Sequence, residues 1–254
     1  MRKPVIASLK NLAISSTLAS ISALIGSVVL TTQPGQATTI TLEFDSLPSQ
    51  QGWNYYGVPD YIPESSVFST DGTKLLQNSM GTGLYSSGSN YYRLWGVPDP
   101  NLPFTLEVRA RVLQEETNVS YENSFGFFFG ATFGSDAVAI AISPNRIQLA
   151  DYTPVSRTID NRQFHTYLLR GQVGKGFDFL VDNVLIYQGD FLKGDYPSLL
   201  LFGDGTGGTN AQAELTYFRF SQAHPNSQSV PEPLSLLGII GATSLGLLMK
   251  HNSK

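Results

Sequence analysis

Aromatic side chains and one arginine are concentrated in residues 51–103, a segment otherwise rich in Gly, Ser, Asn and Pro. Aromatic faces stack on the apolar faces of sugar rings, while Tyr and Trp keep one polar atom for a hydrogen bond. A guanidinium adds donors for sugar hydroxyls. The alternative is that these side chains only cover the edge and plug the open end of the fold. The predicted ligand-binding residues are Trp53, Tyr91, Tyr92, Arg93 and Trp95.

Paired carboxylates are the second chemistry to look for. Retaining glycosidases need two carboxyl groups ~5–5.5 Å apart and inverting ones ~6.5–9.5 Å apart, whereas neighbours on one face of a strand lie ~6.6 Å apart. The best fragment is Glu43-Phe44-Asp45, which favours a solvated strand face. Asp178 and Asp182 would stand ~13 Å apart on one strand. The sequence therefore predicts a protein that is not an enzyme.

Other reaction classes lack their residues. The 254 residues contain no cysteine, which excludes disulfides, thiolate zinc sites and cysteine nucleophiles. His165 is the only histidine within residues 38–221, so no histidine metal cluster can form there, and a serine triad has a single candidate base. Asp204, in a glycine-rich stretch, is a weak calcium candidate, because loop carboxylates and carbonyls suit that ion. No other cofactor is predicted.

Charge excludes one class of partner. Residues 38–229 carry 11 Lys and Arg against 19 Asp and Glu, a net charge of −8 with the histidines neutral. Nucleic acid binds basic surfaces, so it is not a predicted partner. A body of roughly 190 residues buries about 70% of its unfolded surface. That is enough for one hydrophobic core that is stable without disulfides or metal ions.

The elements that position these residues are predicted to be strands. Apolar and polar residues alternate with a period of two along most of the body, and no helical period appears. Asp182-Asn183 separates two such runs, and an Asn there tolerates positive φ in a hairpin turn. Many short strands with turns between them predict an antiparallel sandwich. The expected strand ranges are 40–45, 104–112, 125–133, 138–142, 147–149, 164–170, 177–181, 184–187, 199–202 and 213–220.

The first 37 residues have the pattern of a secretory signal peptide. Arg2, Lys3 and Lys10 precede an uncharged run over residues 11–30. Small residues before position 38 satisfy a signal-peptidase site, so cleavage is expected after Ala37. The alternative is an uncleaved anchor. In both cases the basic residues are expected to stay on the cytoplasmic side and the body outside.

The last residues predict a membrane segment. Pro231 and Pro233 prevent a helix from starting before residue 234, and residues 234–249 carry no charge. Sixteen residues at ~1.5 Å each give roughly 24 Å, somewhat short of a hydrocarbon core of ~30 Å. The alternative is a buried core helix, which would need something to pack against.

The motif Pro231-Glu232-Pro233, an apolar helix and a basic end together resemble the PEP-CTERM sorting tail, over residues 230–254 only. The resemblance implies an exosortase-type membrane peptidase that cuts near the motif, in a Gram-negative bacterium that secretes polysaccharide matrix. The basic end departs from the arginine cluster usual in the family, so removal of the tail stays open.

The runs 104–109, 164–167 and 177–185, in this order, resemble a concanavalin A-like, laminin G-like jelly roll, and the resemblance covers residues 38–221. It implies a sandwich whose concave sheet often binds glycans and in some branches hydrolyses them. The glucanase branch carries Glu-x-Asp-x-x-Glu on one strand. Glu43-Phe44-Asp45 is not followed by the second glutamate, so that signature is absent.

Together these patterns predict a signal peptide (1–37), a β-sandwich (38–221), a polar linker (222–229) and a sorting tail (230–254). The expected function is an exported protein, held at a membrane at least transiently and then at the cell surface or in the matrix, that binds or helps structure polysaccharide without catalysis. Its expected partners are signal peptidase, an exosortase-type peptidase, the membrane and a polysaccharide. Two alternatives remain: a glycoside hydrolase of the glucanase type, and a purely structural envelope or matrix component.

Overall fold

The structure is a computed structural model that describes residues 38–58, 62–81, 89–117, 125–156, 158–205 and 208–223. The predicted signal peptide with Ala37, the motif Pro231-Glu232-Pro233 and the apolar segment 234–249 lie outside these residues, so they remain predictions. Within the described ranges, no helix combines the length and the apolar character that crossing a membrane requires.

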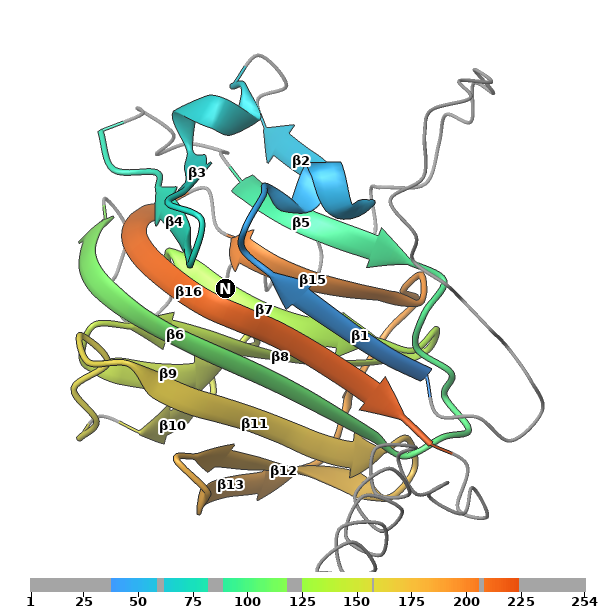
Figure 1. Ribbon diagram of the computed structural model, residues 1–254. Coiled ribbons are helices and arrows are strands. Elements are labelled where there is room, and N and C mark those ends of the chain that lie inside the picture. The colour runs from blue at the N-terminus through green and yellow to red at the C-terminus, as the bar shows by residue number, and fades with distance from the viewer. Residues whose placement is uncertain are drawn as a thin grey trace, which may run out of the picture. The chain divides into compact units, whose positions relative to one another are not determined.

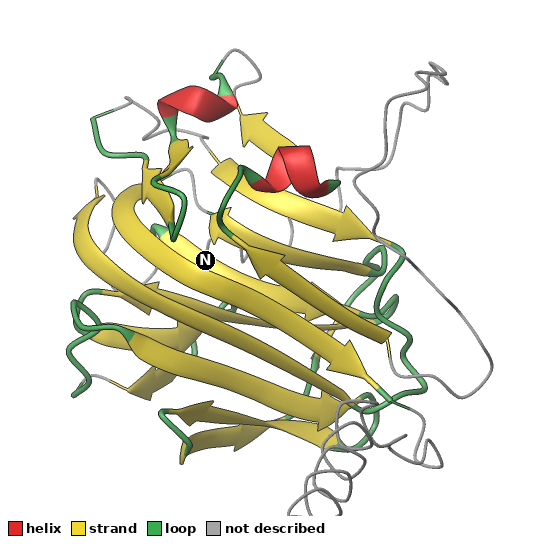
Figure 2. Ribbon diagram, in the orientation of Figure 1, coloured by secondary structure: helices red, strands yellow, loops and turns green. Residues whose placement is uncertain are grey.

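Two antiparallel eight-stranded sheets pack face to face (Figure 1). Sheet A has the order β13 (Val184–Gly189), β12 (Gly176–Val181), β11 (His165–Gln172), β6 (Phe104–Thr117), β16 (Thr209–Gln222), β4 (Leu75–Asn78) and β3 (Phe68–Thr70), with β1 (Thr38–Glu43) also paired to β16. Sheet B has the order β10 (Pro154–Ser156), β9 (Arg146–Leu149), β8 (Asp136–Ser143), β7 (Phe127–Thr132), β15 (Leu199–Asp204), β5 (Ser89–Trp95) and β2 (Asn54–Val58), with β14 (Leu192–Lys193) paired to β8. The predicted all-β antiparallel sandwich is confirmed. The described helices are two short 3₁₀ turns, Pro48–Gln51 and Glu64–Ser66 (Figure 2).

The main core lies between the sheets and follows the period-two pattern. On β6, the inward side chains from Phe104 to Val112 are at most 3% exposed, whereas Thr105 between them is exposed. Phe127 and Phe129 face them from β7 in the same core. Burial of one face of each sheet is therefore what fixes the strand register.

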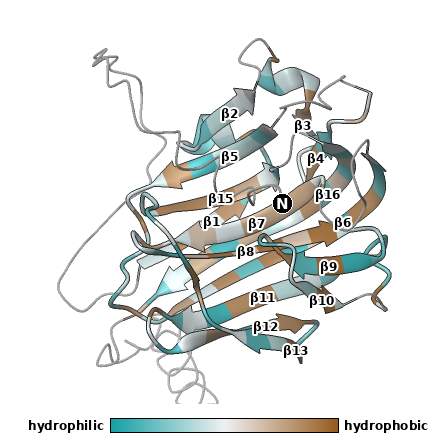
Figure 3. Cartoon of the chain, turned by 180° about the vertical axis from the view of Figure 1, so that it is seen from behind, coloured by the Kyte–Doolittle hydropathy of each residue, from teal (hydrophilic) through white to brown (hydrophobic). Residues whose placement is uncertain are grey.

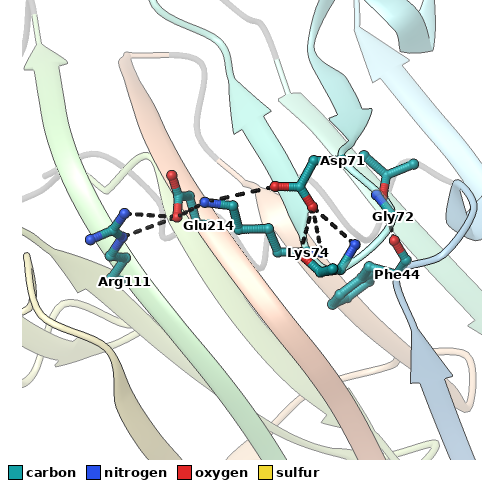
Figure 4. Close-up of polar contacts among 8 residues, drawn as sticks. Phe44, Asp71, Gly72, Lys74, Arg111 and Glu214 are labelled. Atoms are coloured by element: carbon teal, nitrogen blue, oxygen red, sulfur yellow. Dashed lines mark hydrogen bonds and ion pairs between the residues drawn. The ribbon is translucent and has the colours of Figure 1, made fainter.

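The outer face of sheet A is polar and ion-paired. Glu214 on β16 binds Arg111 at 2.9 Å and Lys74 at 2.8 Å, and Asp71 lies 3.9 Å from the same lysine (Figure 4). Arg219 lies between Glu43 and Glu107, at 3.8 and 3.9 Å. These carboxylates already have partners, which is the arrangement of a solvated structural face.

The middle of the outer face of sheet B, around β15, is apolar. β15 is hydrophobic over most of its length in the view from behind (Figure 3). Its outward Leu199 and Leu201 belong to a second hydrophobic cluster, separate from the main core. That cluster also contains Tyr91, Phe125, Phe128, Ala137, Ala141, Ala150 and Tyr196. Around β15, sheet B is thus hydrophobic on both faces, unlike sheet A.

Two local conformations depend on particular residue types. The β12–β13 turn places Asp182 at φ 50° and Asn183 at φ 66°, as predicted for the hairpin. Gly203 on β15 has φ 136°, and a Cβ there would lie 2.7 Å from the Cα of Tyr91. Only glycine therefore allows β15 to run this close to β5.

The segment 51–103 differs from the expectation, because it supplies four strands, β2, β3, β4 and β5. The alternation is present in β5, but both faces of this strand carry aromatic residues. Its sequence therefore shows no simple alternation of apolar and polar residues from which the strand could be predicted.

Candidate functional site

Strand β5 separates the predicted ligand-binding residues onto two faces. Tyr92 points inward and is fully buried, with its ring 5.4 Å from that of Phe202. Trp53 is 5% exposed and packs in the same core, 5.2 Å from Phe202 and 5.1 Å from Phe218. A side chain between the sheets cannot stack on a surface sugar. Trp53 and Tyr92 therefore have a core role, which corrects the prediction for these two residues.

The other three predicted residues share the outer face of sheet B. Tyr91, Arg93 and Trp95 alternate with inward residues on β5, and Trp95 is 41% exposed. These three predicted residues therefore share one face of β5, although Tyr91 is only 4% exposed there, and their role in binding stays a prediction.

Edge strand β2 adds two residues that the sequence reasoning did not select. The register pairs Asn54 with Arg93 and Tyr56 with Tyr91, so both side chains lie on the outer face. Tyr55 points inward, where its hydroxyl donates to Asn90 Oδ1 at 2.7 Å. The sequence contained one signal for an outward tyrosine, the doublet Tyr55-Tyr56. Since successive residues of a strand face opposite sides, one of the two tyrosines must lie on the outer face.

We call Asn54, Tyr56, Tyr91, Arg93 and Trp95 the platform. The guanidinium carbon of Arg93 lies 4.3 Å from the ring centroid of Tyr56, 5.1 Å from that of Trp95 and 5.8 Å from that of Tyr91. The rings of Tyr56 and Tyr91 are 5.0 Å apart. One cation is therefore held among three aromatic rings at the β2 edge of sheet B.

The electrostatics of the platform are unusual for this protein. Nε and Nη1 of Arg93 are buried and have no hydrogen-bond acceptor in the described structure. Burial raises the pKa of Tyr91 to about 12, even though the positive charge of Arg93 opposes that rise. The Tyr91 phenol therefore stays protonated at neutral pH. The platform offers aromatic faces and donors, and none of its five residues is acidic.

A second site surrounds Glu115 near the end of β6. Its Oε1 accepts hydrogen bonds from Ser143 Oγ at 2.9 Å and from the Gly126 amide at 3.0 Å, whereas Oε2 is buried without a partner in the described structure. Burial raises the pKa of this carboxyl, against the opposing effect of those bonds and of Arg146. Glu115 lines a pocket of about 440 Å³. A desolvated carboxyl beside a pocket is the environment that a general acid requires.

The carboxylates considered in the sequence are occupied elsewhere. Glu43 ends β1 and faces Arg219, and Asp45 lies in the following turn with its Oδ1 accepting from Ser46 Oγ at 3.0 Å. Asp178 is held by Arg170 at 3.0 Å. Each of these three carboxylates therefore has a polar partner among the described residues.

His165 and Asp204 also have structural partners. His165 Nδ1 lies 2.6 Å from Asp182, whose pKa is lowered because hydrogen bonds from His165 and the Thr166 amide outweigh burial. Asp204 is 1% exposed and accepts from Ser79 Oγ at 2.6 Å. The described residues contain no group of three His, Cys, Asp or Glu that fits a metal ion. Calcium at Asp204 stays a prediction.

No family model matches the chain, and no curated protein is similar to it. Solved structures are similar over most of its length. A protein of unknown function from Shewanella oneidensis MR-1 has a TM-score of 0.50 and 8% identity, covering 83% of this chain and 99% of its own. The β-glucanase of Bacillus licheniformis has a TM-score of 0.47 and 14% identity, covering 74% and 99%. The carbohydrate recognition domain of Emp46p has a TM-score of 0.38 and 11% identity, covering 66% and 87%.

The fold is an all-β antiparallel sandwich that matches jelly-roll folds. The same comparisons correct the prediction that this protein is not an enzyme, because similar solved structures are titled glycosidic hydrolase, β-glucanase and β-1,3-glucanase. The absence of the Glu-x-Asp-x-x-Glu pattern is therefore no ground for excluding catalysis. Identities of 14–18% show the fold alone and assign no reaction to this chain.

Proposed function

We propose that this chain binds a carbohydrate polymer on the outer face of sheet B, through the platform. The observation that carries the proposal is Trp95, a large aromatic side chain 41% exposed beside Arg93. Exposed aromatic faces with donors next to them match the alternating apolar faces and hydroxyls of a sugar. On the outer face of sheet A, in contrast, the arginines closest to aromatic rings are also ion-paired, Arg111 with Glu214 and Arg219 with Glu107.

The test is binding of the full-length chain to a panel of β-1,3-glucan, cellulose, xylan, alginate and polygalacturonate, measured by isothermal titration calorimetry or affinity gels. Trp95→Ala is expected to weaken binding about two- to tenfold, since an aromatic stack contributes about 0.5–1.5 kcal/mol. Leu185→Ala is the matched control, because Leu185 is also an exposed hydrophobic residue, 47% exposed, but lies on β13 of sheet A. Absence of binding across the panel would favour the purely structural alternative.

Hydrolysis of the bound polymer is the second candidate function, and the environment of Glu115 favours it. A glutamic acid whose pKa burial raises above its ordinary value is better suited to protonate a leaving-group oxygen than an exposed one is. The residues that line its pocket are Leu113, Gln114, Glu115, Pro144, Asn145 and Arg162, so no second carboxylate of the described structure completes the pair there. This candidate predicts release of reducing ends from one of the polymers and loss of that release in Glu115→Gln. If the unaltered chain releases no reducing ends from any of the polymers, this candidate function is wrong.

We also propose that the sandwich is exported and sorted to the cell surface, on the sequence of its termini alone. Signal peptidase would cut after Ala37 and an exosortase-type peptidase near Pro231-Glu232-Pro233. N-terminal sequencing of the protein recovered from cell fractions tests the first cut. Replacement of all three motif residues by alanine tests the second, with accumulation of the longer, membrane-bound form as the expected result.

A further inference from the structure

Arg93 is unlike the other arginines that the structure describes. Arg111, Arg162, Arg170 and Arg219 are each ion-paired with a carboxylate. Arg109 and Arg146 each donate a hydrogen bond to a hydroxyl, of Thr166 at 3.3 Å and of Ser143 at 3.1 Å. Arg93 makes no ion pair with a described residue, and its one hydroxyl neighbour is the phenol of Tyr91, whose pKa a hydrogen bond with Arg93 helps to lower; its Nε and Nη1 are buried without a partner in the described structure.

The surroundings of Arg93 bury two of its donor nitrogens without giving them an acceptor in the described structure. Its neighbours across the sheet are Leu201 on β15 and Asn54 on β2, and its guanidinium lies over the rings of Tyr56 and Trp95. Stacking on aromatic faces attracts a cation, and Arg favours this position because its planar group is weakly hydrated. The stack leaves Nε and Nη1 unpaired, since a ring face accepts N–H donors only weakly.

Two buried donors without acceptors are unfavourable on their own, because unpaired buried donors cost free energy. Arg93 as a whole is only half-buried, so a ligand anion at its exposed part would offset this cost through its charge. A carboxylate accepts charge-assisted hydrogen bonds from a guanidinium, and such bonds are stronger than those to a neutral hydroxyl. None of the five platform residues is acidic. The anion that pairs with Arg93 therefore has to come from the ligand.

We propose that the polymer bound at the platform is acidic and that Arg93 binds the carboxylate of a uronic acid residue, while Trp95 and Tyr56 contact the sugar rings. This inference rests on the proposed carbohydrate-binding function and adds the class of sugar. It makes Arg93 a determinant of specificity for charged over neutral polymers.

The test compares each acidic polymer with its own methyl ester, which keeps the sugar skeleton and removes the charge. Polygalacturonate and alginate oligosaccharides and their methyl esters are titrated into the purified full-length chain at low and high salt. At least one acid form is expected to bind at least tenfold more tightly than its ester at low salt, and this preference should shrink at high salt because the charges are screened. Equal binding of acid and ester forms would overturn the inference while leaving the proposed function intact. Absence of binding to any polymer, acidic or neutral, would overturn both.

Two variants assign the preference to Arg93. Arg93→Gln is expected to abolish the preference for the acid form but keep weak binding of the ester, whereas Trp95→Ala should weaken both forms by a similar factor. Arg93→Lys keeps the charge and loses the planar fork, so an intermediate preference is expected. An unchanged preference for the acid form in Arg93→Gln would place the anion elsewhere. If Arg93→Gln fails to fold, the acid and ester titrations of the unaltered chain still decide whether the ligand is acidic.

Discussion

The guanidinium carbon of Arg93 lies 4.3 Å from the ring centroid of Tyr56, on the neighbouring strand. This contact depends on the register of β2 against β5, because a slip by one residue would turn Tyr56 into the core and Tyr55 outward. The inward hydroxyl of Tyr55, which donates to Asn90 at 2.7 Å and to Ile62 O at 3.3 Å, opposes such a slip. A buried tyrosine thus fixes the position of its exposed neighbour.

Replacement of Tyr56 by alanine is expected to weaken carbohydrate binding about two- to tenfold, because it removes one ring of the platform and returns Arg93 to water. The matched control is Tyr217→Ala on sheet A, where the guanidinium of Arg219 lies 4.2 Å from the ring centroid of Tyr217. Arg219 is ion-paired there, so this variant should bind normally. Equal losses in both variants, measured by calorimetry with the same polymer, would show that the platform has no special role.

Trp53→Ala is expected to destabilise the fold by about 3–5 kcal/mol, the usual cost of removing a large buried aromatic side chain. The indole is 5% exposed and lies 5.1 Å from Phe218 and 5.2 Å from Phe202 in the core. Urea unfolding measures the change, and Trp95→Ala, with its exposed ring, should cost less than about 1 kcal/mol. A small effect at Trp53 would place this residue outside the core.

Glu115→Gln is expected to change how stability depends on pH. Because burial raises the pKa of Glu115 above its ordinary value of 4.5, the folded chain holds a proton that the unfolded chain has released between these two pKa values. The free energy of unfolding therefore falls as pH rises through this window, and the contribution is fully present below 4.5. The glutamine variant should lose this slope and be more stable at neutral pH.

The measurement is denaturant unfolding across the pH range, with Glu43→Gln as the control because the Glu43 side chain is 63% exposed. If the Glu115→Gln variant keeps the slope of the unaltered chain, another group is responsible for it.

Glu214→Ala is expected to cost about 1–3 kcal/mol, because the carboxylate is only 11% exposed and its removal leaves Arg111 and Lys74 without their shared partner. Asp160→Asn breaks the pair with Arg162, whose side chains are 59% and 52% exposed, and should cost less than about 0.5 kcal/mol. Thermal unfolding of both variants compares them directly. Equal costs would mean that the network of Figure 4 adds nothing beyond an ordinary surface pair.

The sequence predicted those strands that have one apolar face and one polar face. Strand β6 shows this best, because its inward Phe104 and Leu106 alternate with polar residues. The turn at Asn183 was also readable, since few residues tolerate its positive φ. Strand β5 was missed because aromatic residues occupy both of its faces, and the β2 register that brings Tyr56 beside Arg93 is a tertiary property with no local signal.

The candidate site was predictable only in part for the same reason. Tyr91, Arg93 and Trp95 were found from composition, but composition cannot separate a buried aromatic residue such as Tyr92 from an exposed one. Glu115 was missed altogether, because its environment is made by Gly126 and Ser143 from other strands and loops. The reaction class stayed undetermined because a fold this widely shared does not specify one.

The most direct test of the account is the fluorescence of Trp95 during titration with polymer. The chain has two tryptophans, so the variant Trp53→Phe leaves Trp95 as the single reporter, on the proposed binding surface. The account predicts that polygalacturonate or alginate changes the Trp95 emission in a saturable way, and that the methyl ester of the same polymer needs at least tenfold higher concentration. Emission that stays unchanged at saturating concentrations of every polymer would contradict it.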